Sequence, residues 1–396
     1  MPTPDGPARP APVLGAPTGR VRLYQTLRTA HLEQALQLAP ATILYRARRY
    51  DFDEDLAARL DLVRAGPLRA AWLLLRSPVD EFEINEPLMR YAVRGTALAV
   101  AAVRLRSLLT RRRTTIVTYA IENCDPYALR RPRGWRALLR RAVDRRLSGA
   151  VWRSVDRVVF GTAAARDVYR ARLSPPRPAE VLLPALPQPC PTCAPAPPDG
   201  KRVVFLGALS ERKGVPLLMA AWPLVRQRFP DARLTVVGQG ALEDAVREWA
   251  AGDGSVELVV DPPRARIHEV LRRAAVLVLP SQPQPAWREQ LGLPLTEALS
   301  HGVPVVTTTE TGLADWLAEH GHGVVDSPGT PATLADAVVA RLRDAPSRDS
   351  VLAALPARDG RLAADDWLFA PRPDQPAAGA AASVRRRRRS RRTYQR

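Results

Sequence analysis

The sequence predicts an α/β protein built from two Rossmann-like domains that face each other across a cleft. Three observations predict this fold. Short apolar runs alternate with helical segments along most of the chain, a proline-crowded stretch at 184–199 interrupts the alternation near its middle, and 396 residues are too many for one compact core. We expect ligands to bind between the two domains, at the carboxyl ends of their strands.

The N-terminal half alternates strand-like and helical segments. Predicted strands lie at 21–27, 41–46, 79–84, 114–120 and 156–161. Predicted helices lie at 31–38, 54–63, 88–109 and 134–155. Strands that alternate with helices favour a parallel sheet covered on both faces, so we place the first domain at 20–183. Residues 1–19, which are rich in Pro, Gly and Ala, are predicted to be disordered.

Residues 184–200 are predicted to be a linker, because proline fixes φ and removes the backbone donor. The second domain is placed at 201–355. Its predicted strands lie at 202–207, 232–238, 255–260, 275–281 and 303–308, and its predicted helices at 215–228, 241–251, 267–274, 295–302, 313–320 and 331–344. Segment 356–383 contains LAADDWLF, a helix-like stretch for which we consider packing on the first domain. Residues 384–396 are expected to be a disordered basic tail.

The chain is strongly basic, with a formal charge of +19 and a pI of about 11.1. Eight of its arginines lie in the tail between Arg385 and Arg396. This charge favours anionic partners such as phosphates, nucleic acid or an acidic membrane surface. Only Lys201 and Lys213 are lysines, and the abundance of Arg, Ala and Pro suggests genomic drift in composition. We therefore do not expect nucleic acid to be a partner.

Three cysteines form no disulfide framework and fit a reducing cytosol. The N-terminus lacks the apolar core of a signal peptide, and the longest apolar stretch, near 96–103, is too short to span a bilayer. We expect a cytoplasmic protein, either soluble or peripheral at the inner face of the cell membrane. Cys190 and Cys193 form a Cys-x-x-Cys in the linker. We expect neither metal nor redox chemistry there, because the sequence shows no second pair or nearby histidine and the flanking prolines forbid a helix.

The stretch WREQLGLPLTEALSHGVPVV carries two carboxylates, Glu289 and Glu297, on either side of a Gly-Leu-Pro turn. We expect Glu297 in the first turn of the helix that follows. Backbone N–H groups of Gly292 and Leu293, with the helix dipole, would bind a phosphate. A carboxylate early in that helix suits a ribose diol, and Glu289 suits sugar hydroxyls. The alternative is an ordinary loop-to-helix junction in which Glu297 favours the helix dipole.

GLPLTEALSHGVPVV, preceded by Glu289, resembles the Glu-x7-Glu signature of retaining glycosyltransferases with the GT-B fold. The group it resembles most is glycosyltransferase family four, or glycosyl transferases group one, over roughly residues 203–340. FLGALSERKGVPLLMAAW resembles the family's phosphate-binding strand–loop–helix, and VVGQGALED its Gly-x-Gly turn. LRRAAVLVLPS resembles the strand before the signature, and TTTETGLADWL the loop of backbone amides over the donor sugar.

The resemblance implies a role for each matched residue. Glu297 would bind the donor ribose, Glu289 the donor sugar, and Lys213 the diphosphate leaving group. The implied donor-binding set is Gly207, Lys213, Gly238, Ser281, Gly292, Leu293, Glu297, Thr311 and Gly312. At Ala208 the chain departs from the family, which usually has an arginine there. Arg212 could replace it, because a guanidinium pairs well with phosphate. Lys213, Arg212 and Glu289 are thus the catalytic candidates.

The N-terminal half resembles the family more faintly. FEINEPLMRYA resembles an acidic strand ending in Glu-Pro, and TYAIENCDPYALRRP a strand leading to an aromatic-x-x-Asn turn. The acceptor-side candidates for lining the cleft are Glu86, Tyr119, Glu122 and Asn123, with plain loop and capping roles as the alternative. This half lacks the family's glycine-rich loop and strand-end histidine, since its only histidine is His31.

The resemblance implies a retaining, hexosyltransferase-type enzyme of polysaccharide or cell-envelope biosynthesis. It would move a sugar from a nucleotide-diphosphate sugar to a lipid-linked, polysaccharide or other hydroxyl acceptor, with no cofactor and no metal. Fixed cations and a helix N-terminus would stabilise the leaving phosphate. The alternative is a catalytically silent GT-B relative that binds nucleotide sugars as a subunit. Ala208 and the missing histidine motivate that alternative.

The segment 134–155 is predicted to be a basic amphipathic helix. Its apolar side carries Trp135, Leu138, Leu139, Ala142, Val143 and Leu147, and the arginines off that side are Arg136, Arg140, Arg141 and Arg145. Such a helix can dock on anionic lipid, where a lipid-linked acceptor would lie. The alternative is a helix that covers the core and exposes its arginines to water.

Overall fold

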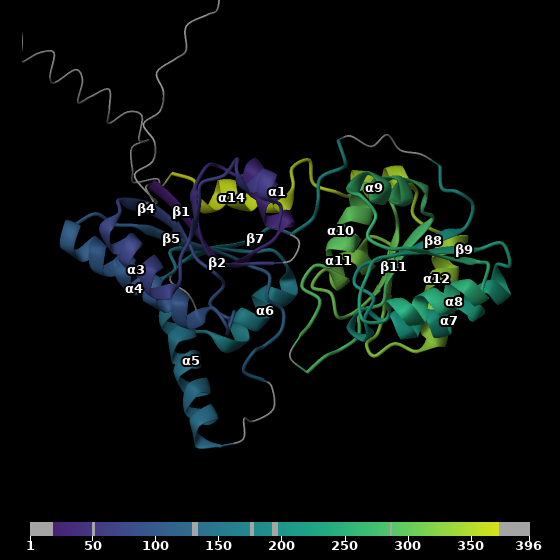
Figure 1. The fold of residues 1–396 in the computed structure, drawn as a ribbon, viewed down its shortest axis with the longest axis horizontal. Coiled ribbons are helices and arrows are strands. Elements are labelled where there is room, and N and C mark those ends of the chain that lie inside the picture. Colours follow the sequence, from purple (N-terminus) through teal and green to yellow (C-terminus); the bar gives the residue numbers. More distant parts are fainter. Residues whose placement is uncertain are drawn as a thin grey trace, which may run out of the picture.

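The computed structural model describes residues 19–49, 52–128, 134–174, 178–191, 197–285 and 287–371. Two α/β units lie side by side, each with helices around a parallel sheet (Figure 1). The chain leaves the first sheet at Leu182 and enters the second at Arg202. Residues 1–18 of the predicted disordered N-terminus, the whole basic tail at 384–396 and Cys193 of the linker lie outside the described residues, and Gly19 begins the first strand.

The first sheet has seven parallel strands in the order β3-β2-β1-β4-β5-β6-β7. They are β1 Gly19–Leu27, β2 Thr42–Arg48, β3 Leu62–Arg64, β4 Val79–Glu83, β5 Thr115–Ala120, β6 Arg157–Phe160 and β7 Ala179–Leu182. Its helices are α1 Thr29–Gln37, α2 Glu54–Ala57, α3 Pro67–Arg76, α4 Val93–Thr110, α5 Trp135–Ser154 and α6 Ala163–Arg172. The strand order reverses between β1 and β4, and open α/β sheets bind ligands beside such a reversal.

Two predictions for the first domain are wrong. The single helix expected at 54–63 is instead the short helix α2 followed by strand β3, because Leu62 and Val63 pair with Ile43 and Leu44 of β2. The helix expected from Leu88 begins only at Val93. Hydrogen-bonded turns occupy the residues before it, with the amide of Met89 donating to the carbonyl of Glu86 at 3.0 Å.

The second sheet has six parallel strands in the order β10-β9-β8-β11-β12-β13. They are β8 Arg202–Leu206, β9 Arg233–Val237, β10 Val256–Val259, β11 Val276–Leu279, β12 Val305–Thr308 and β13 Gly323–Val325. Its helices are α7 Val215–Arg228, α8 Glu243–Gly252, α9 Arg264–Arg273, α10 Leu293–Ser300, α11 Ala314–Glu319, α12 Pro331–Arg343 and α13 Arg348–Ala353, with a 3₁₀ turn η1 at Glu211–Lys213. The predicted class, α/β with two parallel-sheet domains, is confirmed.

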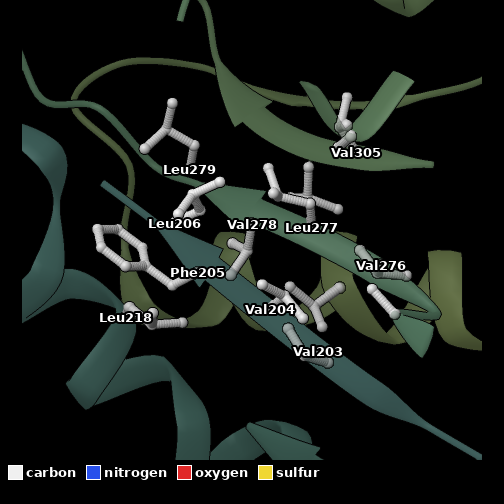
Figure 2. Packing of buried hydrophobic residues seen from close by; sticks show 14 of the residues in the cluster. Val203, Val204, Phe205, Leu206, Leu218, Val276, Leu277, Val278, Leu279 and Val305 are labelled. Atoms are coloured by element: carbon white, nitrogen blue, oxygen red, sulfur yellow. The ribbon is translucent and has the colours of Figure 1, made fainter. Parts of the chain in front are cut away.

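The core of the second unit is built from strands that are apolar on both faces. Side chains of β8 and β11 pack against each other, and Phe205 points toward Leu218 of α7 (Figure 2). Residues 276–279 of β11 are fully buried. Helices on both sides of the sheet require this continuous apolar pattern, and the pattern fixes where each strand ends.

The last described helix, α14 (Gly360–Leu368), lies against the first sheet rather than the second. Figure 1 shows it in yellow over the N-terminal unit. Its Ala364 and Leu368 pack on Val117 of β5 and Val159 of β6. The chain therefore crosses between the two units twice.

A buried cluster of charges fastens α14 to the first sheet. It consists of Arg22, Glu83, Arg361 and Asp365, which we call the buried charge cluster. The Arg22 guanidinium donates to both carboxylate oxygens of Asp365, at 2.7 and 3.1 Å, and also pairs with Glu83. Arg361 pairs with Glu83 from the other side. Two positive and two negative charges therefore balance within the cluster.

None of the helices in the described part of the chain is both long and apolar enough to cross a membrane.

Candidate functional site

The candidate donor site lies at the carboxyl ends of the second sheet's strands. Gly207 follows β8 and Gly238 follows β9, with φ angles of 147° and 151° that favour glycine. A Cβ atom at Gly238 would lie 1.9 Å from the carbonyl oxygen of Gly207. Glycine at position 238 is therefore required for the two strand ends to approach this closely.

Glu289 is the centre of the site. It lies in the loop between β11 and α10, and only 8% of the residue is exposed. Its carboxylate pairs with the ammonium group of Lys213 at the end of η1, and Ser281 donates its hydroxyl to the same carboxylate at 3.0 Å. The turn that delivers Lys213 requires Gly214, since a Cβ there would lie 1.9 Å from the carbonyl oxygen of Pro280. The structure therefore brings Lys213, Ser281 and Glu289 together.

Both cations that the sequence analysis named as catalytic candidates, Arg212 and Lys213, contact one aromatic ring. The guanidinium carbon of Arg212 lies 4.6 Å from the ring centroid of Trp287, and the Lys213 nitrogen lies 5.5 Å from it. Such cation–π contacts hold a charge without neutralising it. Ala208, four residues before Arg212, is exposed and carries no charge. Sequence reasoning gave no role to Trp287, although it stands two residues before Glu289.

The loop after β12 contacts the Glu289 loop through its backbone. The Gly312 amide donates to the carbonyls of Glu289 and Gln290, at 3.1 and 3.0 Å. Thr311 donates its hydroxyl to the carbonyl of Leu291 at 3.0 Å. These two predicted donor residues therefore brace the Glu289 loop in this structure.

Helix α10 presents its N-terminus at the end of the same loop. Gly292 caps the helix with a φ of 73°, and Leu293 is its first residue. Their amides lie where the first N–H groups of a helix point outward, as an anion site requires. The expectation that Glu297 lies in the first turn is wrong, because it is the fifth residue of α10 and belongs to the second turn.

The Glu297 carboxylate accepts a hydrogen bond from the guanidinium of Arg264 at 2.6 Å. Arg264 is the first residue of α9, 33 positions earlier in the chain. Sequence reasoning missed this partner, because no local pattern links the start of one helix with the middle of another.

Two acceptor-side candidates, Glu122 and Asn123, contact the second domain directly. The Asn123 side-chain amide donates to the carbonyl of Glu289 at 2.8 Å. The side-chain amide of Gln290 donates to Glu122 at 3.1 Å. The loop after β5 therefore meets the Glu289 loop, and the two domains touch at the candidate site.

The other two acceptor-side candidates are turned inward. Glu86 is 6% exposed, and its carboxylate accepts hydrogen bonds from the amides of Ile121 and Glu122 and from the hydroxyl of Tyr169. The Tyr119 hydroxyl is buried, and the Arg361 guanidinium lies 4.9 Å from its ring centroid. The structure therefore corrects the expectation that these two side chains line the cleft. Glu86 instead supports the loop that carries Glu122 and Asn123.

Burial, together with the nearby Glu122 carboxylate, raises the pKa of the Glu86 carboxyl to about 8. An unfolded glutamate titrates near pH 4.5. Between these values the unfolded state has lost a proton that the folded state keeps, so stability falls as pH rises from 4.5 to about 8.

The variant Glu86→Gln removes this titration but keeps an acceptor for the loop amides. We expect its melting temperature to fall less between pH 5 and pH 8 than that of the unaltered protein, as measured by differential scanning fluorimetry. An equal fall in melting temperature for the two proteins between pH 5 and pH 8 would contradict the raised pKa of Glu86.

Comparison with known proteins finds a family match over the second domain. Residues 200–344 match the family "Glycosyl transferases group 1". The chain is 34% identical over 166 residues to a phosphatidyl-myo-inositol mannosyltransferase of Mycobacterium leprae. That alignment covers 41% of this chain and 43% of the relative, so the chain spans less than half the length of the curated relatives that it matches.

Two solved structures show the same fold over most of the chain. WaaG, a glycosyltransferase involved in lipopolysaccharide biosynthesis, matches 89% of this chain and 100% of its own, with a TM-score of 0.59 and 16% identity. Alr3699/HepE of Anabaena, solved in complex with UDP, matches 89% of this chain and 95% of its own, with a TM-score of 0.59 and 15% identity. The fold is that of the GT-B glycosyltransferases, and the resemblance read from the sequence is confirmed.

Proposed function

We propose, from the membership of residues 200–344 in the group 1 glycosyl transferases, that this chain transfers a sugar from a nucleotide-diphosphate sugar to a hydroxyl acceptor. The observation that carries the proposal is the meeting of Lys213, Ser281 and Glu289 at the strand ends where the two domains touch. A relative named as a mannosyltransferase and a structural neighbour solved with UDP support it.

The chemistry follows from the charges at this place. Breaking the bond between a sugar and a diphosphate leaves negative charge on the departing oxygens, which fixed cations stabilise. The Lys213 ammonium is paired with Glu289 in this structure. When the donor binds, the ammonium group would leave that carboxylate and pair with the diphosphate. Glu289, still held by Ser281, would then accept hydrogen bonds from hydroxyls of the donor sugar. The amides of Gly292 and Leu293 would bind the distal phosphate.

The transfer proceeds with retention in this proposal. The acceptor oxygen bonds to the anomeric carbon on the face from which the diphosphate oxygen departs, and the departing phosphate takes the acceptor's proton. No enzymic nucleophile is needed, and the protein supplies positioning and positive charge. Arg212, held over Trp287 beside Lys213, supplies the cation that Ala208 lacks. On this proposal the transfer step itself uses no metal.

A calorimetric titration with UDP, GDP and ADP, followed by assays of donor hydrolysis and transfer, tests the proposal. We expect one diphosphate to bind and its sugar derivative to be consumed. Binding without hydrolysis or transfer would favour the silent, nucleotide-sugar-binding subunit, which the neutral residue at Ala208 motivates. Absence of binding to all three would contradict the assignment of the site.

The proposed acceptor is lipid-linked, because the first domain exposes an apolar and basic surface. Helix α5 packs on the core through Val151 and Trp152, and the large apolar side chains of its first half face the solvent. Its large side chains Trp135, Leu138, Leu139 and Val143 are 68%, 50%, 56% and 38% exposed. A hollow of about 920 Å³ runs along the helix, and its lining includes Arg141, Arg145, Arg146 and Arg153. Basic helices with exposed apolar side chains bind anionic lipid, which would place the protein at a membrane surface.

The double variant Trp135→Ser/Leu139→Ser should weaken binding to vesicles that contain phosphatidylglycerol by about tenfold or more, because it removes apolar surface that would enter the lipid. Vesicle sedimentation measures this change. Leu293→Ser, which alters a half-exposed leucine of the second domain, is the matched control and should leave binding unchanged. Equal binding of the double variant and the unaltered protein would contradict the membrane proposal.

A further inference from the structure

Three side chains from distant parts of the chain meet behind helix α10. Cys190 comes from the segment between the two sheets, His268 from α9, and His301 from the residue that ends α10. The sulfur of Cys190 lies 4.0 Å from Nδ1 of His268, and that nitrogen lies 3.0 Å from Nε2 of His301. The three potential ligand atoms all lie within 4.8 Å of one another.

The histidine at the end of α10 is held in a defined orientation. Its Nδ1 lies 2.7 Å from the carbonyl oxygen of Glu297, so this nitrogen carries the proton and donates it. Nε2 therefore turns its lone pair toward His268 and Cys190. A histidine that donates one N–H to a backbone carbonyl and offers its other nitrogen is the usual arrangement of a metal ligand.

The cysteine is held in place by its own backbone. The Cys190 amide donates to the carbonyl of Ser300 at 2.8 Å, which ties this segment to the last turn of α10. The thiol is partly buried, as is His268, and His301 is 6% exposed. The three groups therefore form a fixed and largely enclosed set.

The spacing fits one class of ion. Zn²⁺ takes imidazole nitrogen at about 2.0–2.1 Å and thiolate sulfur at about 2.3 Å in tetrahedral sites. That geometry separates two nitrogens by about 3.4 Å and a nitrogen from a sulfur by about 3.6 Å. The observed separations of 3.0 and 4.0 Å differ from these values by less than half an ångström. All three ligand atoms lie within 4.8 Å of one another, so an ion would draw the Cys190 thiolate toward the two nitrogens.

We propose that Cys190, His268 and His301 bind a zinc ion that fastens the interdomain segment to α10. Nitrogen and thiolate ligands select Zn²⁺ over Mg²⁺ and Ca²⁺, which prefer oxygen. The ion would hold the end of α10, the helix that carries Glu297, and would take no part in sugar transfer. The sequence analysis expected no histidine near Cys190, but the structure places His268 within 4.0 Å of its sulfur. His268 is 78 positions away in sequence, and the fold brings it into contact.

Metal binding to the full chain, purified without a histidine tag and stripped with a chelator, tests the proposal. After incubation with zinc chloride and gel filtration, we expect about one zinc per chain by mass spectrometry. Cobalt(II) should give the near-ultraviolet charge-transfer band that needs a thiolate ligand. Cys190→Ser should abolish that band, and both Cys190→Ser and His301→Gln should weaken zinc affinity by about a hundredfold or more in a chelator competition.

Matched controls separate the site from general effects. Cys124→Ser and His320→Gln alter the same residue types outside the cluster and should keep the metal. Lys213→Ala should also keep it, so failure of the zinc site and failure of the proposed transferase site are distinguishable. Circular dichroism establishes that each variant is folded. The proposal is overturned if the unaltered chain retains no stoichiometric zinc, or if a folded Cys190→Ser binds it with unchanged affinity.

Discussion

Replacing Lys213 with alanine is expected to lower kcat/KM for sugar transfer by about 10²- to 10³-fold, the usual effect of losing one group that stabilises a departing oxyanion. Lys213 is buried against Glu289, and its nitrogen lies 5.5 Å from the centroid of the Trp287 ring. Without this lysine, Arg212 is the remaining cation at the ring. Steady-state kinetics with the donor identified by calorimetry would measure the loss.

The chain offers a matched control, because Lys201 is its only other lysine. Lys201 pairs with Asp231 at the surface, so Lys201→Ala should leave kcat/KM unchanged. A second variant separates chemistry from stability, since Lys213→Ala alone leaves the Glu289 carboxylate buried and unpaired. Lys213→Met/Glu289→Gln replaces the ion pair by a neutral pair of similar size. Full activity in that folded double variant would refute the catalytic role of Lys213.

Replacing Arg361 with leucine is expected to cost about 3–5 kcal/mol of stability, since it leaves the buried charge cluster with one negative charge in excess. Glu83 and Asp365 would then share Arg22, whose guanidinium is 1% exposed. Urea unfolding followed by tryptophan fluorescence would show the transition of the first domain at a lower urea concentration.

The same helix provides the control for that experiment. Arg358, just before α14, pairs with Asp366 at 3.0 Å, and both side chains are more than half exposed. Exposed pairs contribute about 0–1 kcal/mol, so Arg358→Ala should shift the transition little. Equal shifts of the urea transition in Arg358→Ala and Arg361→Leu would show that burial of the cluster does not increase its contribution to stability.

The second sheet is predictable from sequence to a degree that the first is not. β11 is apolar throughout and β8 is apolar after Arg202, and the residues that follow them, Pro280 and Gly207, mark where each strand ends. In the first sheet, β3 has three residues and β7 has four, which is too short for an alternating pattern to be recognised. Their places are fixed by pairing with β2 and β6, which local sequence does not encode.

The candidate site also has a part that the sequence predicts and a part that it does not. Glu289, Lys213 and Ser281 could be chosen from motifs, since each follows a strand whose end is visible in the sequence. The contacts of Lys213 and Ser281 with Glu289 could not be predicted from the sequence, because they form only when the loop carrying Glu289 folds back on η1. The Arg264 partner of Glu297 and the histidines beside Cys190 are invisible for a related reason: they meet only after several helices have packed.

The position of α14 has a consequence for the order of events during synthesis. The first domain begins to emerge from the ribosome early, but Arg22 and Glu83 find Asp365 and Arg361 only after the second domain has been made. Until then, two buried charges of that domain lack half of their partners, and the apolar surface of Val117 and Val159 lacks its cover. The nascent N-terminal domain should therefore stay loosely packed and open to chaperones, and a ribosome stalled before residue 360 should display a protease-sensitive N-terminal domain.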